Sequence, residues 1–562
     1  MFSEYTPTHS ETLVFIGAGA TATLGMPSSD NQTKIFRNLC DEEKSKEEIL
    51  SPYFSEPDLS KVIHFLNFLD NDTFFEVRDS DLQSAEMVYG KQDQKILQNR
   101  ILELRSEYDW NAAKKVLKIC PHNEENDNLI RDAYSIIDKK LLAHQSLKVR
   151  GCLNKSGNDI SCEEILSPSR LQGARNFLTL FINMLFAGAW YKISKGEKSD
   201  EFAKYKKFIK AFDRLMQKEG IHLSGQGKKF HDRDFYLFST SFVSFNFEMV
   251  FPWIFMNSHY ELNHQPPYIQ DHPLKLWLDY GVEHRGRKLD DKGNIIPTLE
   301  FTESVASREN EDDHIGTPIN RAGKFYFAHG SSAWRECPVC GRMTFFHGNN
   351  DWGDYKSKKI IPSFPIPLFE SEKTDTKEFT EEEIKWRKEL KYDSLQCMHC
   401  GSETKASDAP MIMQTMYKST PTSFLEEIQR NVKISLEKAK HIVLLGYRLP
   451  PDDTIWQHAF AEGIRARTES EDAAFCTVVV GHKGEEKWIN PDELDSYIKK
   501  YKDKGDGYGI DAIQNAIAIF GKNNVRAWTG GIPQVFGNCT EKNVKDLLYP
   551  DFVKWAGTRI EK

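Results

Sequence analysis

The stretch Leu13-Val14-Phe15-Ile16-Gly17-Ala18-Gly19-Ala20-Thr21 predicts a short buried strand that leads directly into a tight turn. Four consecutive apolar residues are typical of a strand covered on both faces, and the glycines permit the sharp turn that opens a helix. Such a turn brings backbone N–H groups and the positive end of a helix to one place, which suits a pyrophosphate. Gly17, Gly19 and Ala22 also fit the G-x-G-x-x-(G/A) pattern of dinucleotide-binding turns. A strand, turn and helix with a purely structural role is the alternative for these residues alone.

Length and composition are typical of a globular chain with several domains. The chain has 562 residues, of which 39% are apolar and 28% are charged, so it can bury a sizeable core. Disorder is not expected at this composition. The formal net charge of −9 argues against non-specific nucleic-acid binding by the whole chain, and we expect no direct nucleic-acid partner.

No segment predicts secretion or membrane insertion. Residues 1–11 are polar and lack the basic and apolar regions of a signal peptide. The most apolar segment, residues 177–191, is about five residues shorter than a membrane span and contains Asn183, so it predicts a buried core helix. Four of the ten cysteines form two CxxC pairs and six are scattered, which does not indicate a disulfide scaffold. We therefore expect a cytoplasmic protein.

A long helical region follows the glycine turn. Residues 25–30 are small or turn-forming and predict a loop beside the pyrophosphate position. Across residues 35–228, apolar side chains recur at three- and four-residue spacing and strand signals are scarce. Residues 151–158 predict a loop inside this region. We interpret the region as a helical insertion, which commonly forms a cap or an oligomer surface.

Further strands are predicted in the second half of the chain. The segment 234–247 is rich in aromatic and β-branched residues, and its strand should end at Asn246. Residues 257–319 contain prolines and acidic stretches and predict a loop or a second surface insertion. The remaining strands are predicted over residues 325–328, 441–446, 475–481 and 525–528, with a helix over 423–439.

Strands that alternate with helical stretches predict a parallel, doubly wound α/β sheet. Ligands of such sheets bind at the carboxyl ends of the strands. Gly17, Asn246, His329 and Gly446 all fall at predicted strand ends. The sequence therefore predicts a ligand site that these four positions share.

Two CxxC pairs form the strongest local signal. The first pair is Cys337 and Cys340, the second is Cys397 and Cys400, and a glycine follows each pair. Four thiolates at this spacing are typical of a closed tetrahedral zinc site that supports structure and leaves no open position for catalysis. Lost metal binding and redox-active dithiols are the alternatives. The long segment between the two pairs must loop out of the module.

Two polar residues at strand ends are candidates for chemistry. His329 ends a predicted strand just before the first CxxC pair, where its imidazole could act as a general base near neutral pH. The Asn246 amide could hold a ribose hydroxyl, a carboxamide or a water. A structural histidine and a strand-end Asx turn are the alternatives. Residues 444–453 leave a strand through a second glycine turn, which could hold the other half of a dinucleotide.

We predict an α/β fold: a doubly wound Rossmann-like parallel sheet with a large helical insertion and a small zinc-binding module of four cysteines. The predicted segments are 1–34 (first part of the nucleotide-binding domain), 35–230 (helical insertion), 231–330 (domain continued), 331–410 (zinc-ribbon module), 411–485 (domain continued) and 486–562 (C-terminal segment with the last strand and helices).

Together these pieces resemble the sirtuin superfamily, and more closely its prokaryotic SIR2-like branch. The order and spacing of the motifs agree with that branch over about residues 11–29 and 234–481, which leaves the helical insertion and the C-terminal segment outside. The matching motifs are Gly17-Ala18-Gly19-Ala20-Thr21, Gly25-Met26-Pro27, Ser244-Phe245-Asn246-Phe247-Glu248, His329-Gly330, the two CxxC pairs and Gly446-Tyr447-Arg448-Leu449-Pro450-Pro451-Asp452-Asp453.

The resemblance implies that the chain consumes NAD+, with Asn246 and His329 as the catalytic pair and a structural zinc ion on the four cysteines. Many SIR2-like proteins look like NAD+-consuming effectors of antiphage defence, so it also implies an NAD+ glycohydrolase that is latent until triggered. Latency predicts a homo-oligomer or a separately encoded regulatory partner. The NAD+ contacts implied by the resemblance are Gly17, Ala18, Gly19, Ala20, Thr21, Gly25, Pro27, Asn246, Gly446, Tyr447 and Leu449.

Four departures from the deacylating sirtuins weaken a deacylase assignment more than an NAD+ assignment. Ser28-Ser29-Asp30 replaces aspartate-phenylalanine-arginine, Glu248 replaces an aspartate, Thr21 replaces a serine, and Gly481-His482 replaces an asparagine. An NAD+-dependent protein deacylase and a non-catalytic NAD+ or ADP-ribose sensor are the alternatives. A dehydrogenase is disfavoured, because the acidic residues about 20 positions after the glycines lie in a helical stretch.

Overall fold

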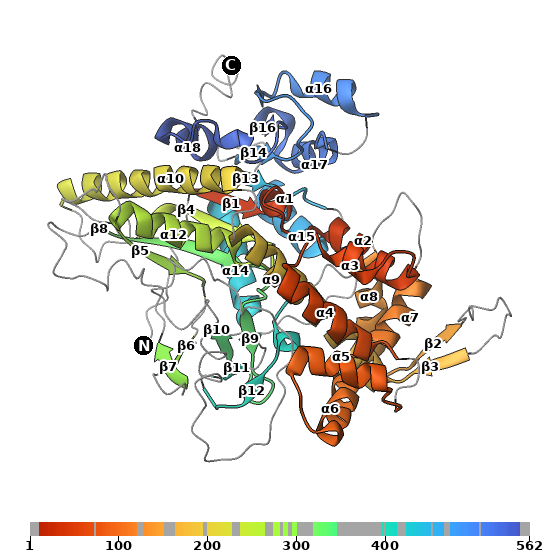
Figure 1. The fold of residues 1–562 in the computed structure, drawn as a ribbon. Coiled ribbons are helices and arrows are strands. Elements are labelled where there is room, and N and C mark those ends of the chain that lie inside the picture. The colour runs from red at the N-terminus through yellow and green to blue at the C-terminus, as the bar shows by residue number, and fades with distance from the viewer. Residues whose placement is uncertain are drawn as a thin grey trace.

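The protein has an α/β fold built on a mostly parallel eight-stranded sheet with many helices around it (Figure 1). The computed structural model describes residues 11–71, 75–120, 129–150, 163–194, 199–227, 237–264, 274–281, 285–289, 295–299, 319–345, 395–397, 399–412, 423–450, 453–465, 473–504 and 507–550.

The strands of the main sheet follow the order β15-β16-β14-β13-β1-β4-β8-β5. Every neighbouring pair is parallel except β15 and β16, which are antiparallel. The central strand β1 is buried along its whole length, as its continuous apolar run predicts. The strands are β1 (Thr12–Ile16), β4 (Leu237–Ser244), β5 (Leu274–Asp279), β8 (Ile319–Phe327), β13 (His441–Leu445), β14 (Phe475–Val479), β15 (Trp488–Ile489) and β16 (Val525–Trp528).

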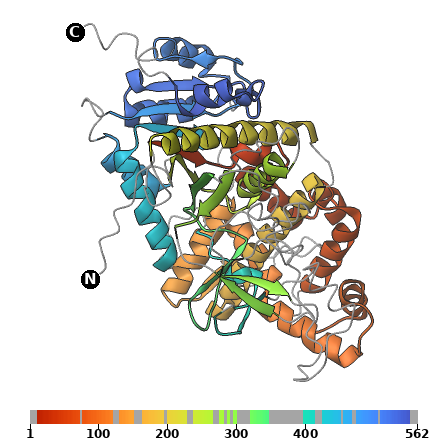
Figure 2. The ribbon, with the colours of Figure 1, turned by 90° about the vertical axis from the view of Figure 1, so that its left-hand side faces the viewer.

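Helices cover both faces of this sheet. Phe242 of β4 packs against Phe212 and Phe255 of two helices on one face. Phe15 of β1 lies in the opposite orientation and packs against Phe460. The first face carries α10 (Ser199–Gly225), α12 (Val250–His264) and α18 (Glu541–Leu548), and the second carries α14 (Ser423–Lys438), α15 (Thr454–Gly463) and α17 (Ile510–Phe520). Figure 2 shows α10 (yellow) running beneath the C-terminal elements (blue).

The predicted helical insertion is largely helical, and its helices α2–α8 gather beside the sheet (Figure 1). Aromatic contacts such as Trp110–Phe177 and Phe36–Phe181 join its helices into one core. The helices are α2 (Ser29–Asp41), α3 (Lys46–Leu50), α4 (Glu56–Leu69), α5 (Asp79–Tyr89), α6 (Gln94–Glu107), α7 (Trp110–Ile119), α8 (Leu129–Leu142) and α9 (Pro168–Ser194).

The remaining elements are short. A second sheet has the strand order β7-β6-β10-β9, and the pairs β2–β3 and β11–β12 are each antiparallel. The elements are α1 (Gly19–Ala22), β2 (Leu147–Arg150), β3 (Glu163–Leu166), β6 (Arg285–Leu289), β7 (Ile295–Leu299), β9 (Trp334–Glu336), β10 (Met343–Phe345), β11 (Leu395–Gln396), β12 (Glu403–Thr404), η3 (Ala406–Asp408), α16 (Leu494–Tyr501), η5 (Lys522–Asn524) and η6 (Gln534–Phe536).

Three expectations need correction. The segment 257–319 is not only loop or surface insertion, because β5 joins the main sheet there by pairing with β8. The loop expected over 25–30 ends early: α2 begins at Ser29, and the Ser28 hydroxyl caps it by accepting from the Asn31 backbone N–H. The helical insertion contains one strand pair, β2–β3, on either side of the predicted loop 151–158, which lies outside the described residues.

The apolar segment 177–191 lies inside α9, and most of its side chains are buried, as predicted for a core helix. Within the described ranges, no helix combines the length and apolar character needed to cross a membrane.

A buried carboxyl group on α10 makes a prediction about stability. Asp213 is fully buried, and neither carboxyl oxygen has a hydrogen-bond partner among the described residues. Burial raises the pKa of Asp213 well above its usual range, and Lys210 opposes this only in part. The folded chain therefore retains a proton that the unfolded chain releases above about pH 4.

We expect the Asp213→Asn variant to unfold less readily than the wild type at pH 7. Because the folded state binds the extra proton, the wild type loses up to about 1.4 kcal/mol of stability per pH unit above about pH 4 from this group, and the variant does not. Urea unfolding from pH 5 to 8 measures the difference. Asp200→Asn, at an exposed residue in the first turn of α10, is the control and should match the wild type. A stability difference between Asp213→Asn and the wild type that does not vary with pH would contradict this account.

Candidate functional site

The four predicted strand-end positions lie together at the carboxyl edge of the main sheet. Gly17 follows β1 directly, Gly446 follows β13 directly, and Asn246 and His329 each stand two residues after β4 and β8. The registers align these ends, because Ile16 pairs with both Ser244 and Leu445. After β1, the strands β4, β5 and β8 lie on one side of it, and the later strands β13, β14, β15 and β16 lie on the other. The strand order therefore reverses at β1. Ligands of open α/β sheets bind at such a reversal.

The turns after β1 and β13 pack directly on each other. The Gly17 N–H donates to the Leu445 carbonyl at 3.0 Å, and the Gly19 N–H donates to the Gly446 carbonyl at 3.1 Å. Gly446 has a φ of +65°, and a Cβ there would lie 2.1 Å from the Ala20 nitrogen. Only glycine fits this position, since a side chain would push the two turns apart.

We expect Gly446→Ala to destabilise the protein by about 2 kcal/mol or more, because backbone strain adds to a collision with the neighbouring turn. Gly227→Ala is the matched control: Gly227 has a φ of +82° with no atom within 4 Å of an added Cβ. The control should show only the strain, about 1–2 kcal/mol. Urea unfolding of both variants measures the two losses. Equal losses would show that the packing of the two turns contributes nothing.

The helix that follows the first glycine turn is shorter than expected. The helix α1 has only four residues, and the N–H groups of Gly17, Gly19, Ala20 and Thr21 already donate to backbone carbonyls. A single turn has little macrodipole. The expected attraction of a pyrophosphate to a helix N-terminus is therefore weak in this structure, and positive charge must come from side chains.

Asn246 is fixed by hydrogen bonds to the glycine turn. Its Nδ2 donates to the Gly17 carbonyl at 3.0 Å and to Glu248 Oε1 at 3.1 Å. Its backbone N–H donates to the Ser244 hydroxyl at 3.1 Å. Because the amide nitrogen is used within the protein, the amide oxygen is the group that can accept from a water or a ribose hydroxyl.

Glu248 completes this network. Its carboxyl group is almost fully buried and accepts from the Thr21 hydroxyl at 2.7 Å as well as from Asn246. Burial raises the pKa of Glu248 to about 7, although these two hydrogen bonds act in the opposite direction. A carboxyl group that titrates near neutral pH thus lies two residues from Asn246.

His329 is held from several sides. Its ring packs against Phe245 with the centroids 4.7 Å apart, and its Nε2 lies 3.6 Å from Asp453 Oδ2. Its backbone carbonyl accepts from the Ile412 N–H at 2.8 Å. Gly330, with a φ of +82°, lets the chain pass so close to Pro410 that a Cβ would lie 1.5 Å from the Pro410 carbonyl oxygen. The segment that returns from the cysteine module therefore fixes the His329 backbone.

One cavity of about 350 Å³ lies at this edge of the sheet, a volume within the range of small-molecule sites. The predicted site residues that line it are Gly17, Ala18, Thr21, Pro27, Asn246, His329 and Tyr447. The other predicted contacts, Gly19, Ala20, Gly25, Gly446 and Leu449, do not line it. Gly19 and Gly446 act by bringing the turns together, and Ala20 and Leu449 are fully buried.

Part of the cavity wall comes from the helical insertion and could not be predicted from the sequence. Side chains of α8 and α9 in the insertion line the cavity, namely Ile130, Arg131, Tyr134 and Phe186, and Gln32 and Thr33 of α2, just before the predicted insertion, line it too. Tyr134 is further fixed by a hydrogen bond of 3.0 Å to Thr179 of α9. Helical periodicity predicted a buried face on these helices but carried no signal for its partner. The other lining residues are Met26, Ser29, Asp30, Phe245, Phe247, Glu248, Arg448 and Pro450.

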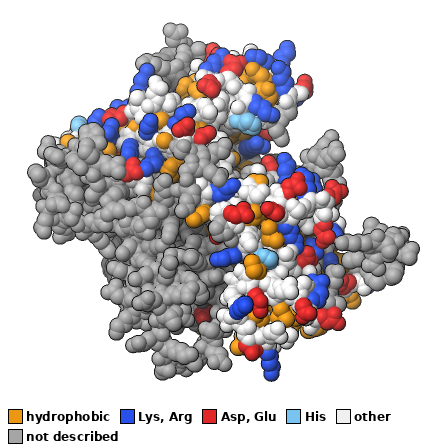
Figure 3. Space-filling view, in the orientation of Figure 1, with side chains coloured by type: hydrophobic (Ala, Val, Ile, Leu, Met, Phe, Trp, Pro, Cys, Tyr) orange, Lys and Arg blue, Asp and Glu red, His pale blue; other side chains and the backbone are white. Residues whose placement is uncertain are grey.

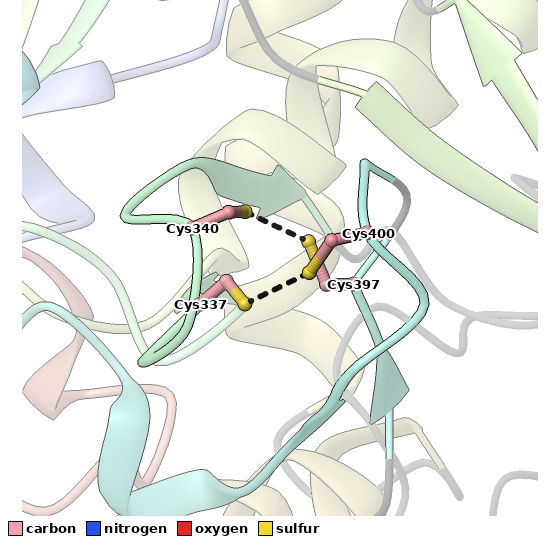
Figure 4. A group of neighbouring side chains, drawn as sticks. All are labelled: Cys337, Cys340, Cys397 and Cys400. Atoms are coloured by element: carbon pink, nitrogen blue, oxygen red, sulfur yellow. Dashed lines mark hydrogen bonds between the residues drawn. The ribbon is translucent and has the colours of Figure 1, made fainter.

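The four predicted cysteine ligands form a cluster apart from the cavity (Figure 4). All four sulfur atoms lie within 4.8 Å of one another, with Cys337–Cys400 at 3.5 Å and Cys340–Cys397 at 3.6 Å. A tetrahedral zinc–thiolate site has sulfurs about 3.8 Å apart, since each Zn–S bond is about 2.3 Å. The cluster could therefore hold a metal ion such as zinc.

Charges are mixed over the visible surface. On the face shown in Figure 3, lysine and arginine side chains are interspersed with aspartate and glutamate over the described helices.

No model of a known protein family matches the chain, and a comparison with curated proteins gives no match.

Proposed function

We propose that the chain is an NAD+ glycohydrolase with a Rossmann-type sheet, which converts NAD+ and water into nicotinamide and ADP-ribose. One observation carries the proposal: Asn246, His329 and the glycine turn, widely separated in sequence, line one cavity at the reversal of strand order. This position is where dinucleotides bind in sheets of this class.

The diphosphate would find positive charge on the cavity wall. Arg131 of α8 and Arg448 after β13 both line the cavity, and guanidinium groups bind phosphate oxygens in pairs of hydrogen bonds. Ala18 and Thr21 also line the cavity, at the turn after β1. We infer that these arginines replace the helix dipole that a longer α1 would supply.

The reaction breaks the bond between nicotinamide and the ribose anomeric carbon. Nicotinamide leaves with the bonding electron pair, which neutralises its pyridinium ring, and a water oxygen bonds to the anomeric carbon. The Asn246 amide oxygen would orient that water or a ribose hydroxyl, and His329 would take the proton that the water loses. Both side chains are buried, so the reacting atoms would lie in a site shielded from bulk water.

A hydrolase is favoured over a protein deacylase by the walls of the cavity. Ile130, Tyr134 and Phe186 of the helical insertion occupy the wall, whereas a deacylase needs a groove for an acylated lysine. The test measures nicotinamide release from NAD+ with and without an acetyl-lysine peptide. The proposal predicts release that the peptide does not change. Release that depends on the peptide would support the deacylase instead.

We further propose that the four cysteines hold structural zinc, because thiolates are its preferred ligands in closed sites.

Since depletion of NAD+ harms a cell, we also propose that activity is controlled by self-association or by a separately encoded partner, as expected of a defence effector. Size-exclusion chromatography combined with light scattering, with and without NAD+, tests whether the chain associates with itself.

A further inference from the structure

A buried carboxylate lies beside His329 and does not line the cavity. Asp453 Oδ2 is 3.6 Å from His329 Nε2, and the two side chains are 1% and 2% exposed. His329 lines the cavity whereas Asp453 does not. The two residues come from different parts of the chain, one after β8 and the other just before α15. No sequence pattern assigns Asp453 a role of its own.

The position of this carboxylate is fixed by its surroundings. The Tyr447 hydroxyl donates to the same Oδ2 at 2.9 Å. The Phe245 ring packs against both the His329 ring and the Tyr447 ring, with centroids 4.7 and 4.3 Å away. The Asp453 backbone carbonyl accepts from the first turn of α15. The loop before it is tied down by Gln457, whose Nε2 donates to the carbonyls of Leu449 and Pro450.

We propose that Asp453 is a positioning residue that orients the His329 imidazole and stabilises its protonated form, an inference that rests on the function proposed above. A carboxylate near Nε2 favours a proton on that nitrogen and leaves Nδ1 as the basic atom. When His329 takes a proton from water, the resulting imidazolium lies beside a negative charge in a site of low dielectric constant. The proton then passes to solvent and restores the neutral ring. Asp453 touches neither substrate nor the reacting atoms.

Steady-state kinetics of the full chain test this role. Asp453→Asn keeps the size of the side chain and its contact with Tyr447 but removes the charge. We expect kcat to fall about 10- to 100-fold while KM changes less than about threefold, since the loss concerns the orientation and protonation of the base and removes no contact with the substrate. Glu462→Gln, an exposed acidic residue on α15, is the matched control and should leave both constants unchanged. If Asp453→Asn does not fold, Asp453→Ser replaces it.

The pH profile separates positioning from a general structural role. Loss of the counter-charge should move the acidic limb of the kcat profile to lower pH in Asp453→Asn, whereas a merely loosened fold lowers kcat without moving the limb. All other ionisable groups at the cavity stay in place: Asp30, Arg131, Tyr134, Glu248, Tyr447 and Arg448. A folded Asp453→Asn enzyme with the wild-type kcat and the wild-type limb would overturn the proposal.

A second measurement separates this inference from the proposed function. The imidazole nitrogen chemical shifts of His329, assigned from the signal lost in His329→Asn, report the protonation of the ring without turnover. We expect Asp453→Asn to change these shifts. An unchanged signal overturns the role of Asp453 even in an active enzyme. If the signal changes but the wild type leaves NAD+ intact, the result supports the contact between Asp453 and His329. In that case only the proposed hydrolase activity is contradicted.

Discussion

Removing zinc from its proposed site on the four cysteines should abolish the proposed activity, although these cysteines do not line the cavity. Thiolate–zinc sites in small modules contribute about 10–16 kcal/mol of apparent binding free energy at pH 7, which far exceeds what so small a module gains from packing. The module is connected to the site through its return segment, where the Ile412 N–H donates to the His329 carbonyl. Unfolding of the module therefore releases the segment that fixes His329.

The test uses Cys337→Ser and the wild type treated with a chelator. We expect both to lose about one equivalent of zinc, to melt at lower temperature and to release no nicotinamide. Cys539→Ser is the control, because Cys539 lies outside the cluster, near the start of α18. It should keep its zinc and its melting temperature. A Cys337→Ser variant with unchanged metal content would contradict the zinc assignment.

Replacing His329 with alanine should lower the rate of nicotinamide release about 10²- to 10⁴-fold, the usual contribution of a general base. Binding should be nearly unchanged, because the turns at Gly17 and Gly446 and the cationic side chains remain. We expect the dissociation constant for NAD+ to change by less than about threefold. The measurement combines product chromatography with calorimetric titration of NAD+.

His458→Ala is the matched control for this variant, since His458 is exposed on α15 and does not line the cavity. It should release nicotinamide at the wild-type rate. Full activity of His329→Ala would remove this residue from the mechanism and leave Asn246 to act with solvent alone.

The core of the sheet could be predicted because buried parallel strands are continuous apolar runs. The strands β1, β13 and β14 appear in the sequence as such runs, each followed by a glycine or a turn. The strand β5 was missed although Leu274, Leu276 and Leu278 alternate with other residues, because the surrounding segment 257–319 is rich in proline and acidic residues. That alternation is itself a strand signal.

The residues at the carboxyl ends of the strands are the part of the site that could be predicted from the sequence. Strand ends placed Gly17, Asn246, His329 and Gly446 together, because parallel strands have their carboxyl ends at one edge. The length of the helix after the glycine turn could not be predicted from the fingerprint. The helix α1 ends before Pro27, and α2 starts anew from the Ser28 cap.

The rest of the site depends on tertiary contacts. Periodicity shows that Tyr134 lies on the apolar face of a helix, but the cavity it lines is set by how α8 packs against α9. Likewise, Asp453 has the sequence context of an ordinary helix N-cap until the fold brings it within 3.6 Å of His329. Contacts between distant segments have no local signature, so neither role could be derived from spacing.

The most direct test of the account follows NAD+ with the full-length chain alone. Nicotinamide and ADP-ribose are quantified over time with the wild type, and NAD+ binding is measured by equilibrium dialysis with the His329→Ala variant, which should bind NAD+ but turn it over slowly. The account predicts saturable binding and release of both products in equal amounts. Intact NAD+ without saturable binding would contradict the assignment of the cavity, and binding without release would contradict hydrolysis by this chain alone.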